Sequence, residues 1–284
     1  MPRILIAGCG YVGTAAADLF HAAGWEVQGW TQSDESAARL TEKPYPVIAV
    51  DVANPREIGR HSENFDVVIH CASTRGGDVD LYRQTYLAGA RNLSQRFLGS
   101  TILFTSSTSV YAQHDGSWVN EESETKPASE TGQILLETEK IVRRAGGLVA
   151  RLAGIYGPRR AAMLRKFLEG EAVIDPENDR YVNQVHRDDI AAALFLLVNR
   201  PAAAGEVYNV VDDQPMLQSD VYRWLSGKLS RPLPPIAKST SASKRGRSNK
   251  RVSNTKLRQL GWVPDYPTFA DAMEKSILAS LSVF

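Results

Sequence analysis

The amino-acid sequence predicts a doubly wound α/β fold, in which helices cover both faces of a parallel sheet. Two observations predict it. Short runs rich in Val, Ile and Leu alternate with helical stretches through the first half of the chain, as strands buried on both faces alternate with crossover helices. The first such run ends in three glycines, Gly8, Gly10 and Gly13, which open a helical stretch. The connections between parallel strands are expected to be right-handed.

Six apolar runs in the first half are the expected strands. Each has the length and aliphatic content of a strand buried on both faces. They span residues 3–7, 26–29, 47–50, 66–70, 101–105 and 147–152.

The stretches between these runs have helical features. Residues 11–23 repeat apolar side chains at helical spacing, and Gly24 follows where the helix should end. Ser33 precedes Glu35 in the pattern of a capped second helix.

After Pro158 the alternation breaks. A short helix is expected at 163–170, a buried helix at 189–198 and a strand at 206–211. We therefore expect a nucleotide-binding domain of residues 1–157 plus about 184–212. A smaller substrate lobe would hold residues 158–183 plus 213–284.

Bulk composition excludes several classes of protein. The net charge is +1 over 284 residues, so no overall field favours nucleic acid or an anionic membrane. The longest apolar run, 190–198, is shorter than the about 20 residues that a bilayer requires, and the first residues lack the layout of a secretory signal. Two cysteines, Cys9 and Cys71, and five scattered histidines form no metal-ligand pattern. We expect a cytoplasmic protein without a metal site or a membrane partner.

The glycine turn predicts a dinucleotide site. Gly8 would permit the tight turn, Gly10 would let a diphosphate approach the backbone, and Gly13 would let helix and strand pack closely. The amides of Tyr11 and Val12 then point at the phosphates from the helix N-terminus. Because the turn follows a strand and opens a helix, its context is that of a dinucleotide-binding Rossmann sheet.

The residues after the second strand leave the choice of dinucleotide open. An NAD site usually places a carboxylate there, about 20 residues beyond the glycines. Here that position reads Thr31, Gln32 and Ser33, and no arginine is present to hold a 2′-phosphate. These three side chains could bind either coenzyme, and the missing carboxylate removes a repulsion against the phosphate. The pattern therefore favours NADP slightly over NAD.

Further motifs give the chain a family resemblance. In order they are FTSSTSVY, RLAGIYGPRR, VHRDDIAAAL, VYNVVDD and VSNTKLRQLGWVPDY. Together with GCGYVG, they resemble the extended short-chain dehydrogenases/reductases, in particular atypical members of the NAD(P)-dependent epimerase/dehydratase group. The resemblance covers nearly the whole chain.

This resemblance implies roles by position. Ser107 would hold a substrate oxygen, Tyr156 would lie beside the nicotinamide, and His186 and Asp189 would return the chain to the coenzyme domain. The further positions that would line the coenzyme are Asp51, Val52, Cys71, Ala72 and Ser73.

The resemblance fails at the reaction centre. The family depends on a Tyr-x-x-x-Lys pair that transfers a proton while hydride moves to or from the coenzyme. Placing the family's downstream glutamate on Glu139 puts Thr131 at the tyrosine and Leu135 at the lysine. Ser107, Tyr111 and Tyr156 are the candidate substitutes, although a structural role competes for each.

Three functions remain open. The first is an epimerase/dehydratase-like oxidoreductase with an atypical site, acting on an anionic, sugar-nucleotide-like substrate. The basic stretch 231–251 would close over that anion, unless it is only a solvated loop. The second is a non-catalytic NAD(P)-binding redox sensor or regulator, and the third a scaffold that binds no dinucleotide. Relatives pair as dimers, so a homodimer is also expected.

Overall fold

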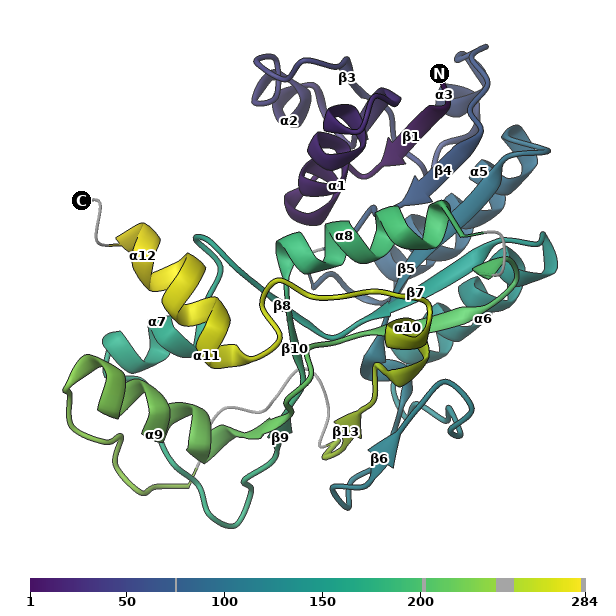
Figure 1. The fold of residues 1–284 in the computed structure, drawn as a ribbon. Coiled ribbons are helices and arrows are strands. Elements are labelled where there is room, and N and C mark those ends of the chain that lie inside the picture. The colour runs from purple at the N-terminus through teal and green to yellow at the C-terminus, as the bar shows by residue number, and fades with distance from the viewer. Residues whose placement is uncertain (75, 201–202, 239–247, 282–284) are drawn as a thin grey trace.

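A parallel seven-stranded sheet forms the centre of the protein, with strand order β11-β7-β5-β4-β1-β2-β3 (Figure 1). The computed structural model describes residues 1–74, 76–200, 203–238 and 248–281. The strands are β1 (Arg3–Ala7), β2 (Glu26–Thr31), β3 (Val47–Ala49), β4 (Val67–His70), β5 (Thr101–Ser107), β7 (Leu148–Leu152) and β11 (Val207–Val210). This sheet confirms the predicted fold class.

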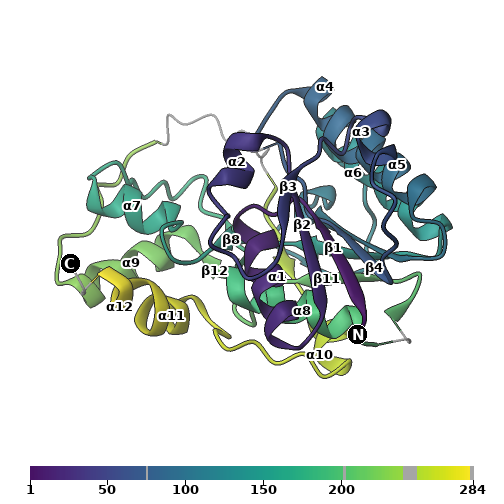
Figure 2. The ribbon, with the colours of Figure 1, turned by 90° about the horizontal axis from the view of Figure 1, so that it is seen from above.

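Helices cover both faces of the sheet. Figure 2 shows α1 (Tyr11–Ala22) and α8 (Arg187–Val198) on one face, and α3 (Pro55–Gly59), α5 (Gly89–Arg96) and α6 (Glu130–Arg144) on the other. The remaining helices of this half are α2 (Asp34–Ala38) and α4 (Val79–Tyr82), and α4 continues through the wider turn Arg83–Ala88 into α5.

Two strands continue beyond their predicted ends. β2 reaches Thr31, which pairs with Ala49 of β3, and β5 reaches Ser107, which pairs with Leu152 of β7. Three of the four added residues, Thr31, Ser106 and Ser107, are polar, so apolar content did not reveal the ends of these strands. Pairing to the neighbouring strand keeps the chain extended at both places.

The hydrophobic core lies within the sheet and beneath its helices. Ile4, Leu5 and Ile6 of β1 and Leu103 and Phe104 of β5 have no exposed surface. Complete burial on both faces explains why these strands are continuous apolar runs rather than alternating ones.

A second hydrophobic cluster organises the C-terminal part of the chain, here called the C-terminal lobe. Tyr156, Leu164, Phe167, Tyr222 and Phe269 are among its buried members. Its helices are α7 (Ala162–Leu168), α9 (Gln218–Leu229), α11 (Phe269–Ala272) and α12 (Leu278–Leu281), with a wider turn, Met273–Ile277, between the last two.

Short strand pairs complete the fold between these two parts. β8 (Gly154–Tyr156) pairs with β10 (Gln184–His186), β9 (Tyr181–Val182) with β12 (Met216–Leu217), and β6 (Trp118–Val119) with β13 (Arg251–Val252). The helix α10 (Thr255–Gln259) follows β13, and a 3₁₀ turn, Thr108–Val110, follows β5.

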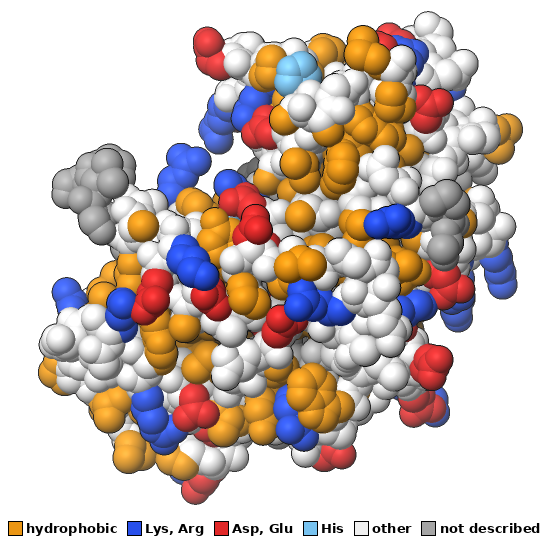
Figure 3. All heavy atoms as spheres, viewed as in Figure 1, with side chains coloured by type: hydrophobic (Ala, Val, Ile, Leu, Met, Phe, Trp, Pro, Cys, Tyr) orange, Lys and Arg blue, Asp and Glu red, His pale blue; other side chains and the backbone are white. Residues whose placement is uncertain are grey.

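Charges of both signs are mixed with hydrophobic side chains on the face drawn in Figure 3, which therefore carries no field of one sign. Within the described ranges, no helix combines the length and apolar content needed to cross a bilayer.

Candidate functional site

The glycine turn between β1 and α1 has three glycines in three different environments. Gly8 has a φ of +111°, and a Cβ there would lie 2.2 Å from the Ala72 nitrogen. A Cβ on Gly13 would lie 2.1 Å from the Gly8 oxygen, whereas a Cβ on Gly10 would meet nothing within 4 Å. Two of the glycines therefore serve packing, and Gly10 borders open space.

This geometry fits a diphosphate ligand. Gly10 is the N-cap of α1, and no side chain caps the free amides of the first turn. Unpaired amides at a helix N-terminus bind anions, because they combine donors with the positive end of the helix dipole. Tyr11 and Val12 follow Gly10 directly in this turn, as predicted for the coenzyme site.

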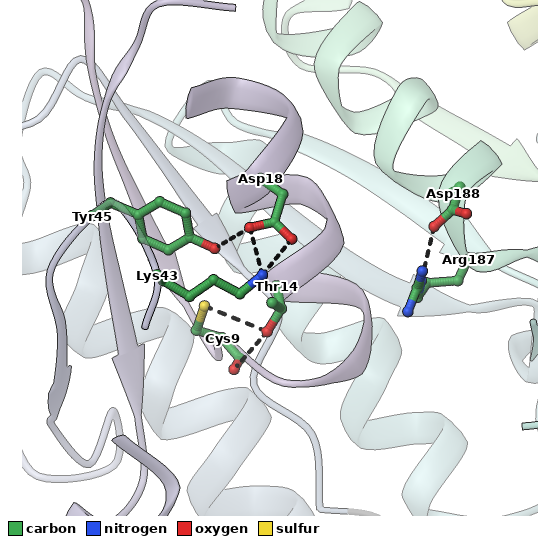
Figure 4. Close-up of polar contacts among 7 residues, drawn as sticks. All are labelled: Cys9, Thr14, Asp18, Lys43, Tyr45, Arg187 and Asp188. Atoms are coloured by element: carbon green, nitrogen blue, oxygen red, sulfur yellow. Dashed lines mark hydrogen bonds and ion pairs between the residues drawn. The ribbon is translucent and has the colours of Figure 1, made fainter. Parts of the chain in front are cut away.

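Polar contacts fix α1 against the loop that precedes β3 and against the glycine turn (Figure 4). The Asp18 carboxylate accepts from Lys43 Nζ at 2.9 and 2.7 Å and from the Tyr45 hydroxyl at 2.6 Å, and Thr14 Oγ1 donates to the Cys9 carbonyl at 3.2 Å. Burial raises the pKa of Tyr45 well above its ordinary range. The hydroxyl therefore stays protonated and holds α1 in place.

Neither thiol near this turn is a reactive group. Burial raises the pKa of Cys9 to about 11 and that of Cys71 to about 12. Because the thiolate is the nucleophile, both cysteines are inert at neutral pH. Among the described residues, no group of His, Cys, Asp and Glu is arranged to hold a metal ion.

A cavity of about 380 Å³ opens beyond the end of β2. Its lining residues are Gln32, Ser33, Asp34, Ala49, Glu57, Arg60 and His61. Two of the predicted residues, Gln32 and Ser33, lie here. Thr31 is 7% exposed, and its hydroxyl donates to the Ser33 carbonyl at 3.2 Å, so it supports the loop from within.

Arg60 and His61 are lining residues that sequence reasoning missed. They follow α3, almost 30 positions after Gln32, and only the fold brings them to the same cavity. The guanidinium of Arg60 is exposed and makes no ion pair or side-chain hydrogen bond within the described part of the chain. No local motif predicts that Arg60 lines this cavity, because the position of Arg60 depends on where α3 packs at the edge of the sheet.

The residues after β3 are held by the helices α3 and α5. The amide of Asp51 donates to Glu57 Oε2 of α3 at 2.8 Å, and the Val52 carbonyl accepts from Asn92 Nδ2 of α5 at 3.0 Å. Val52 is 6% exposed. These contacts fix the loop after β3, where the resemblance implies that the chain lines the coenzyme.

The residues after β4 meet the glycine turn. The amide of Cys71 donates to the Ala7 carbonyl at 2.8 Å, and the close approach of Ala72 to Gly8 follows. Ser73 comes next in the chain. Of the predicted coenzyme residues, Cys71 and Ala72 therefore lie directly against the glycine turn.

Ser107 is the predicted catalytic residue that stays at the carboxyl edge of the sheet. It ends β5, is half-buried, and its Oγ accepts from the Ser109 amide at 3.2 Å. A hydroxyl in this position has a donor hydrogen for a substrate oxygen while its lone pair caps the following turn.

Tyr111, by contrast, lies in the core. Its side chain is fully buried, its hydroxyl donates to Asn209 Oδ1 at 2.9 Å and accepts from Arg151 Nη1 at 2.8 Å. Burial raises the pKa of Tyr111. These contacts do not support the predicted acid–base role, and they fit the competing structural one.

Tyr156 is also removed from the sheet edge. It is 2% exposed, packs against Phe269 and His186 in the C-terminal lobe, and its buried hydroxyl has no partner within the described ranges. Burial raises the pKa of Tyr156 far above its ordinary value. A phenol so enclosed is a poor proton donor to a ligand, so this predicted role is not supported either.

His186 and Asp189 anchor α8. His186 Nδ1 accepts from the Asp188 amide at 3.2 Å, and its Nε2 lies 3.0 Å from Ser276 Oγ. The Asp189 carboxylate accepts from the amides of Asp265 and Tyr266 at 2.7 and 3.2 Å. Both residues therefore join the C-terminal lobe to the sheet domain, as the resemblance implied.

The two positions that replace the Tyr-x-x-x-Lys pair lie on α6. Thr131 is half-buried and its hydroxyl donates to Ser129 Oγ at 3.3 Å, while Leu135 is 4% exposed and belongs to the main core. One turn later, Glu139 forms a buried ion pair with Arg151 at 2.7 Å and accepts from Ser106 Oγ at 2.6 Å. At these positions the helix therefore supplies packing and a structural ion pair, and neither phenol nor ammonium.

The basic stretch 231–251 is only partly described. Lys244, Arg245 and Arg247 lie outside the described residues. Lys238 pairs with Glu177 at 3.1 Å, and the Arg251 guanidinium lies 5.1 Å from the Trp118 ring centre. These two side chains are engaged within the protein itself.

Comparison with known proteins identifies the family. The model of the NAD dependent epimerase/dehydratase family matches residues 4–210. Protein YeeZ of Escherichia coli (strain K12) is 30% identical over 221 residues, which cover 74% of this chain and 77% of YeeZ. A candidate NAD-dependent epimerase/dehydratase from Methylobacillus flagellatus superposes with a TM-score of 0.80 at 28% identity, covering 99% of both chains.

A more distant structure shares the fold. The dTDP-glucose 4,6-dehydratase of Bacillus anthracis in complex with NAD has a TM-score of 0.82 at 17% identity, over 99% of this chain and 97% of that one. The family match, the YeeZ relationship and the glycine turn agree with one another, and the chain belongs to the NAD-dependent epimerase/dehydratase family.

Proposed function

We propose that this protein binds a nicotinamide dinucleotide at the glycine turn. The proposal rests on the difference in packing between the three glycines of the turn. Gly8 and Gly13 are packed against backbone atoms, while Gly10 faces open space beside the uncapped amides of the first turn of α1. A diphosphate fills such a space, because only a residue without a side chain lets it reach the helix N-terminus.

We further propose that NADP is preferred to NAD. The cavity beyond β2 offers the neutral donors Gln32 and Ser33 and the guanidinium of Arg60, which has no ion-pair partner among the described residues. Its carboxylates are Asp34 and Glu57, and both oxygens of Glu57 already accept hydrogen bonds, from the Asp51 amide and Asn54 Nδ2 at 2.8 Å each. An arginine beside neutral donors suits a 2′-phosphate.

The proposed chemistry is that of an epimerase/dehydratase-like oxidoreductase with an atypical active site. The nicotinamide would supply hydride chemistry when bound, and Ser107 would contact the substrate oxygen beside it. Neither Tyr111 nor Tyr156 supports the accompanying proton transfer. Proteins of the same fold include a UDP-glucose 4-epimerase from Thermotoga maritima, solved with UDP-glucose, and the dTDP-glucose 4,6-dehydratase of Bacillus anthracis. On that analogy the substrate is a small anionic, sugar-nucleotide-like molecule.

A non-catalytic NADP-binding regulator is the second candidate. The observation that favours it is the burial of Leu135 and Tyr111, so that neither position supplies half of a phenol–ammonium pair at the sheet edge. Loss of a positioned proton-transfer group costs about 10²–10⁴-fold in rate. Such a protein would bind the coenzyme with unimpaired affinity and turn over slowly or not at all.

Calorimetric titration with NADPH and NADH tests the binding proposals. The wild-type protein should bind both, with NADPH the tighter ligand. Gly10→Ala should fold normally and lose at least about tenfold in affinity for both, since its Cβ occupies the phosphate space. Arg60→Ala should lower the affinity for NADPH about tenfold and leave the affinity for NADH unchanged.

If the wild-type protein binds neither coenzyme, the proposed site at the glycine turn is refuted. If it binds NADPH and NADH with equal affinity, the proposed preference for NADP is refuted.

Single-turnover absorbance at 340 nm together with product analysis separates the two candidate functions. Epimerisation and dehydration regenerate the coenzyme, so turnover appears as a transient absorbance change or as conversion of a supplied sugar nucleotide, and a reductase gives a lasting absorbance change. Ser107→Ala should slow the reaction about 10²-fold or more and should bind NADPH normally. Tight binding with neither an absorbance change nor a product across carbonyl compounds and sugar nucleotides would favour the regulator.

A further inference from the structure

Arginine side chains gather around Tyr11, the first residue of α1. The guanidinium carbons of Arg160 and Arg187 lie 5.4 and 5.0 Å from the centre of the Tyr11 ring. The Tyr11 hydroxyl donates to the Pro158 carbonyl at 2.9 Å. Tyr11 also follows Gly10, so the same residue touches both the glycine turn and the segment that carries Arg160.

That segment is a tight turn with defined geometry. Gly157 and Arg160 exchange two backbone hydrogen bonds of 3.1 and 3.0 Å, which leave Pro158 and Arg159 at the tip. A Cβ on Gly157 would lie 2.7 Å from the Tyr11 hydroxyl. The turn is therefore packed directly against Tyr11, and its arginines are held near the start of α1.

At the tip of the turn, Arg159 has a backbone conformation that is unfavourable for a residue with a side chain. Its φ is +61°, in the left-handed region that side chains other than glycine rarely adopt. Such a conformation costs about 1 kcal/mol or more, and the packing of the turn maintains it.

The side chains around Tyr11, namely Arg159, Arg160, Arg187 and Asp188, carry more positive than negative charge. Arg187 Nε pairs with Asp188 Oδ1 at 2.8 Å. Arg159 and Arg160 are exposed, and neither makes an ion pair within the described part of the chain. Burial raises the pKa of Tyr11, while the guanidinium groups of Arg187, Arg160 and Arg159 stabilise its anionic form. They would stabilise any other anion at the start of α1 in the same way.

We propose that Arg159, Arg160 and Arg187 bind the diphosphate of the dinucleotide, facing the glycine turn across the coenzyme. This inference rests on the proposed coenzyme site. The helix amides would bind the phosphate oxygens from one side, and the guanidinium groups would bind them from the other. Guanidinium forks match phosphate oxygens in geometry and charge. Because Arg159 and Arg160 lead into the C-terminal lobe, the ligand would bridge that lobe and the sheet.

The test uses the double variant Arg159→Ala/Arg160→Ala, which removes exposed side chains without ion-pair partners. NADPH, ADP-ribose and adenosine are titrated by calorimetry into the full-length protein. We expect about a tenfold or greater loss of affinity for NADPH and ADP-ribose, which carry the diphosphate, and none for adenosine. The dependence of NADPH affinity on salt should also become shallower.

Arg165→Ala is the matched control, since Arg165 lies on α7 of the same lobe with its side chain 69% exposed. It should bind all three ligands as the wild-type protein does. The inference is overturned if the double variant binds ADP-ribose with wild-type affinity, or if adenosine binding falls equally. Failure of the wild-type protein to bind NADPH and ADP-ribose would instead refute the coenzyme site itself.

Discussion

Leu135 illustrates how a substituted active-site residue becomes part of the core. It stands where the family's catalytic lysine is expected, and its side chain is 4% exposed among residues of the main hydrophobic cluster. One turn away, Glu139 and Arg151 neutralise each other with side chains 4% and 6% exposed. The loss of the lysine is therefore accompanied by packing that has no place for an ammonium group.

The substitution Leu135→Lys should lower the free energy of unfolding by about 3 kcal/mol, because it places an unpaired charge in an apolar environment. Urea unfolding measures the change. Gln133→Lys, at an exposed position of the same helix, should stay within about 0.5 kcal/mol of the wild type. Equal stability of the two variants would mean that position 135 opens toward solvent or ligand.

At the scale of elements, the turn between β1 and α1 unites packing and binding. Gly8 and Gly13 let the turn approach Ala72 and let α1 approach the sheet, and Gly10 leaves space for a ligand. One motif therefore contains residues whose replacement should affect stability and a residue whose replacement should affect binding.

Gly13→Ala should destabilise the protein by about 3 kcal/mol, since its Cβ would lie 2.1 Å from the Gly8 carbonyl oxygen and backbone must move. Gly10→Ala should change stability by less than about 1 kcal/mol. Chemical denaturation of both variants without coenzyme checks the contrast. The interpretation of the turn fails if the two variants are equally stable.

At the scale of the whole molecule, buried histidines join neighbouring elements. His70 ends β4 and is fully buried, and His186 caps α8 and contacts the C-terminal lobe through Ser276. Burial lowers the pKa of each to about 4. Each is therefore neutral in the folded protein, whereas in the unfolded chain a histidine becomes protonated below about pH 6.5.

The unfolded state consequently binds more protons between about pH 6.5 and 4, so the stability that these histidines contribute is lost as the pH falls through that window. Asp189 and Asp212 act in the opposite direction, because burial raises the pKa of Asp189 to about 6 and that of Asp212 well above its ordinary value, so the folded state binds the extra protons. The contribution of one histidine is therefore measured as a difference between variants: the stability that His70 gives the wild type relative to His70→Gln should decrease by up to about 1.4 kcal/mol per pH unit below about pH 6.5.

Urea unfolding from pH 7 to 4.5 measures this dependence. His70→Gln should lose less stability than the wild type on acidification, and His114→Gln, which changes an exposed histidine, is the matched control and should follow the wild type. Equal pH dependence of the wild type and His70→Gln would contradict the assignment of a neutral, buried His70.

The sequence by itself determined the fold class, the order of strands and helices along the first half of the chain, and the position of the glycine turn. These features depend on local patterns: apolar runs for strands, helical spacing for α1, and glycines where the backbone approaches its neighbours. The family resemblance also came from contiguous motifs, and the family match over residues 4–210 confirms it. The absence of a tyrosine and a lysine at positions 131 and 135 is likewise readable from the sequence.

Only the tertiary structure decided which side chains reach the site. Tyr111 and Tyr156 are aromatic residues next to recognised motifs, but Arg151 and Asn209 enclose one and the C-terminal lobe encloses the other. Arg60 belongs to no motif and Arg160 ends the RLAGIYGPRR motif, yet only the fold places them at a cavity and beside Tyr11. Burial and proximity depend on contacts between residues far apart in the chain, which spacing along the sequence does not encode.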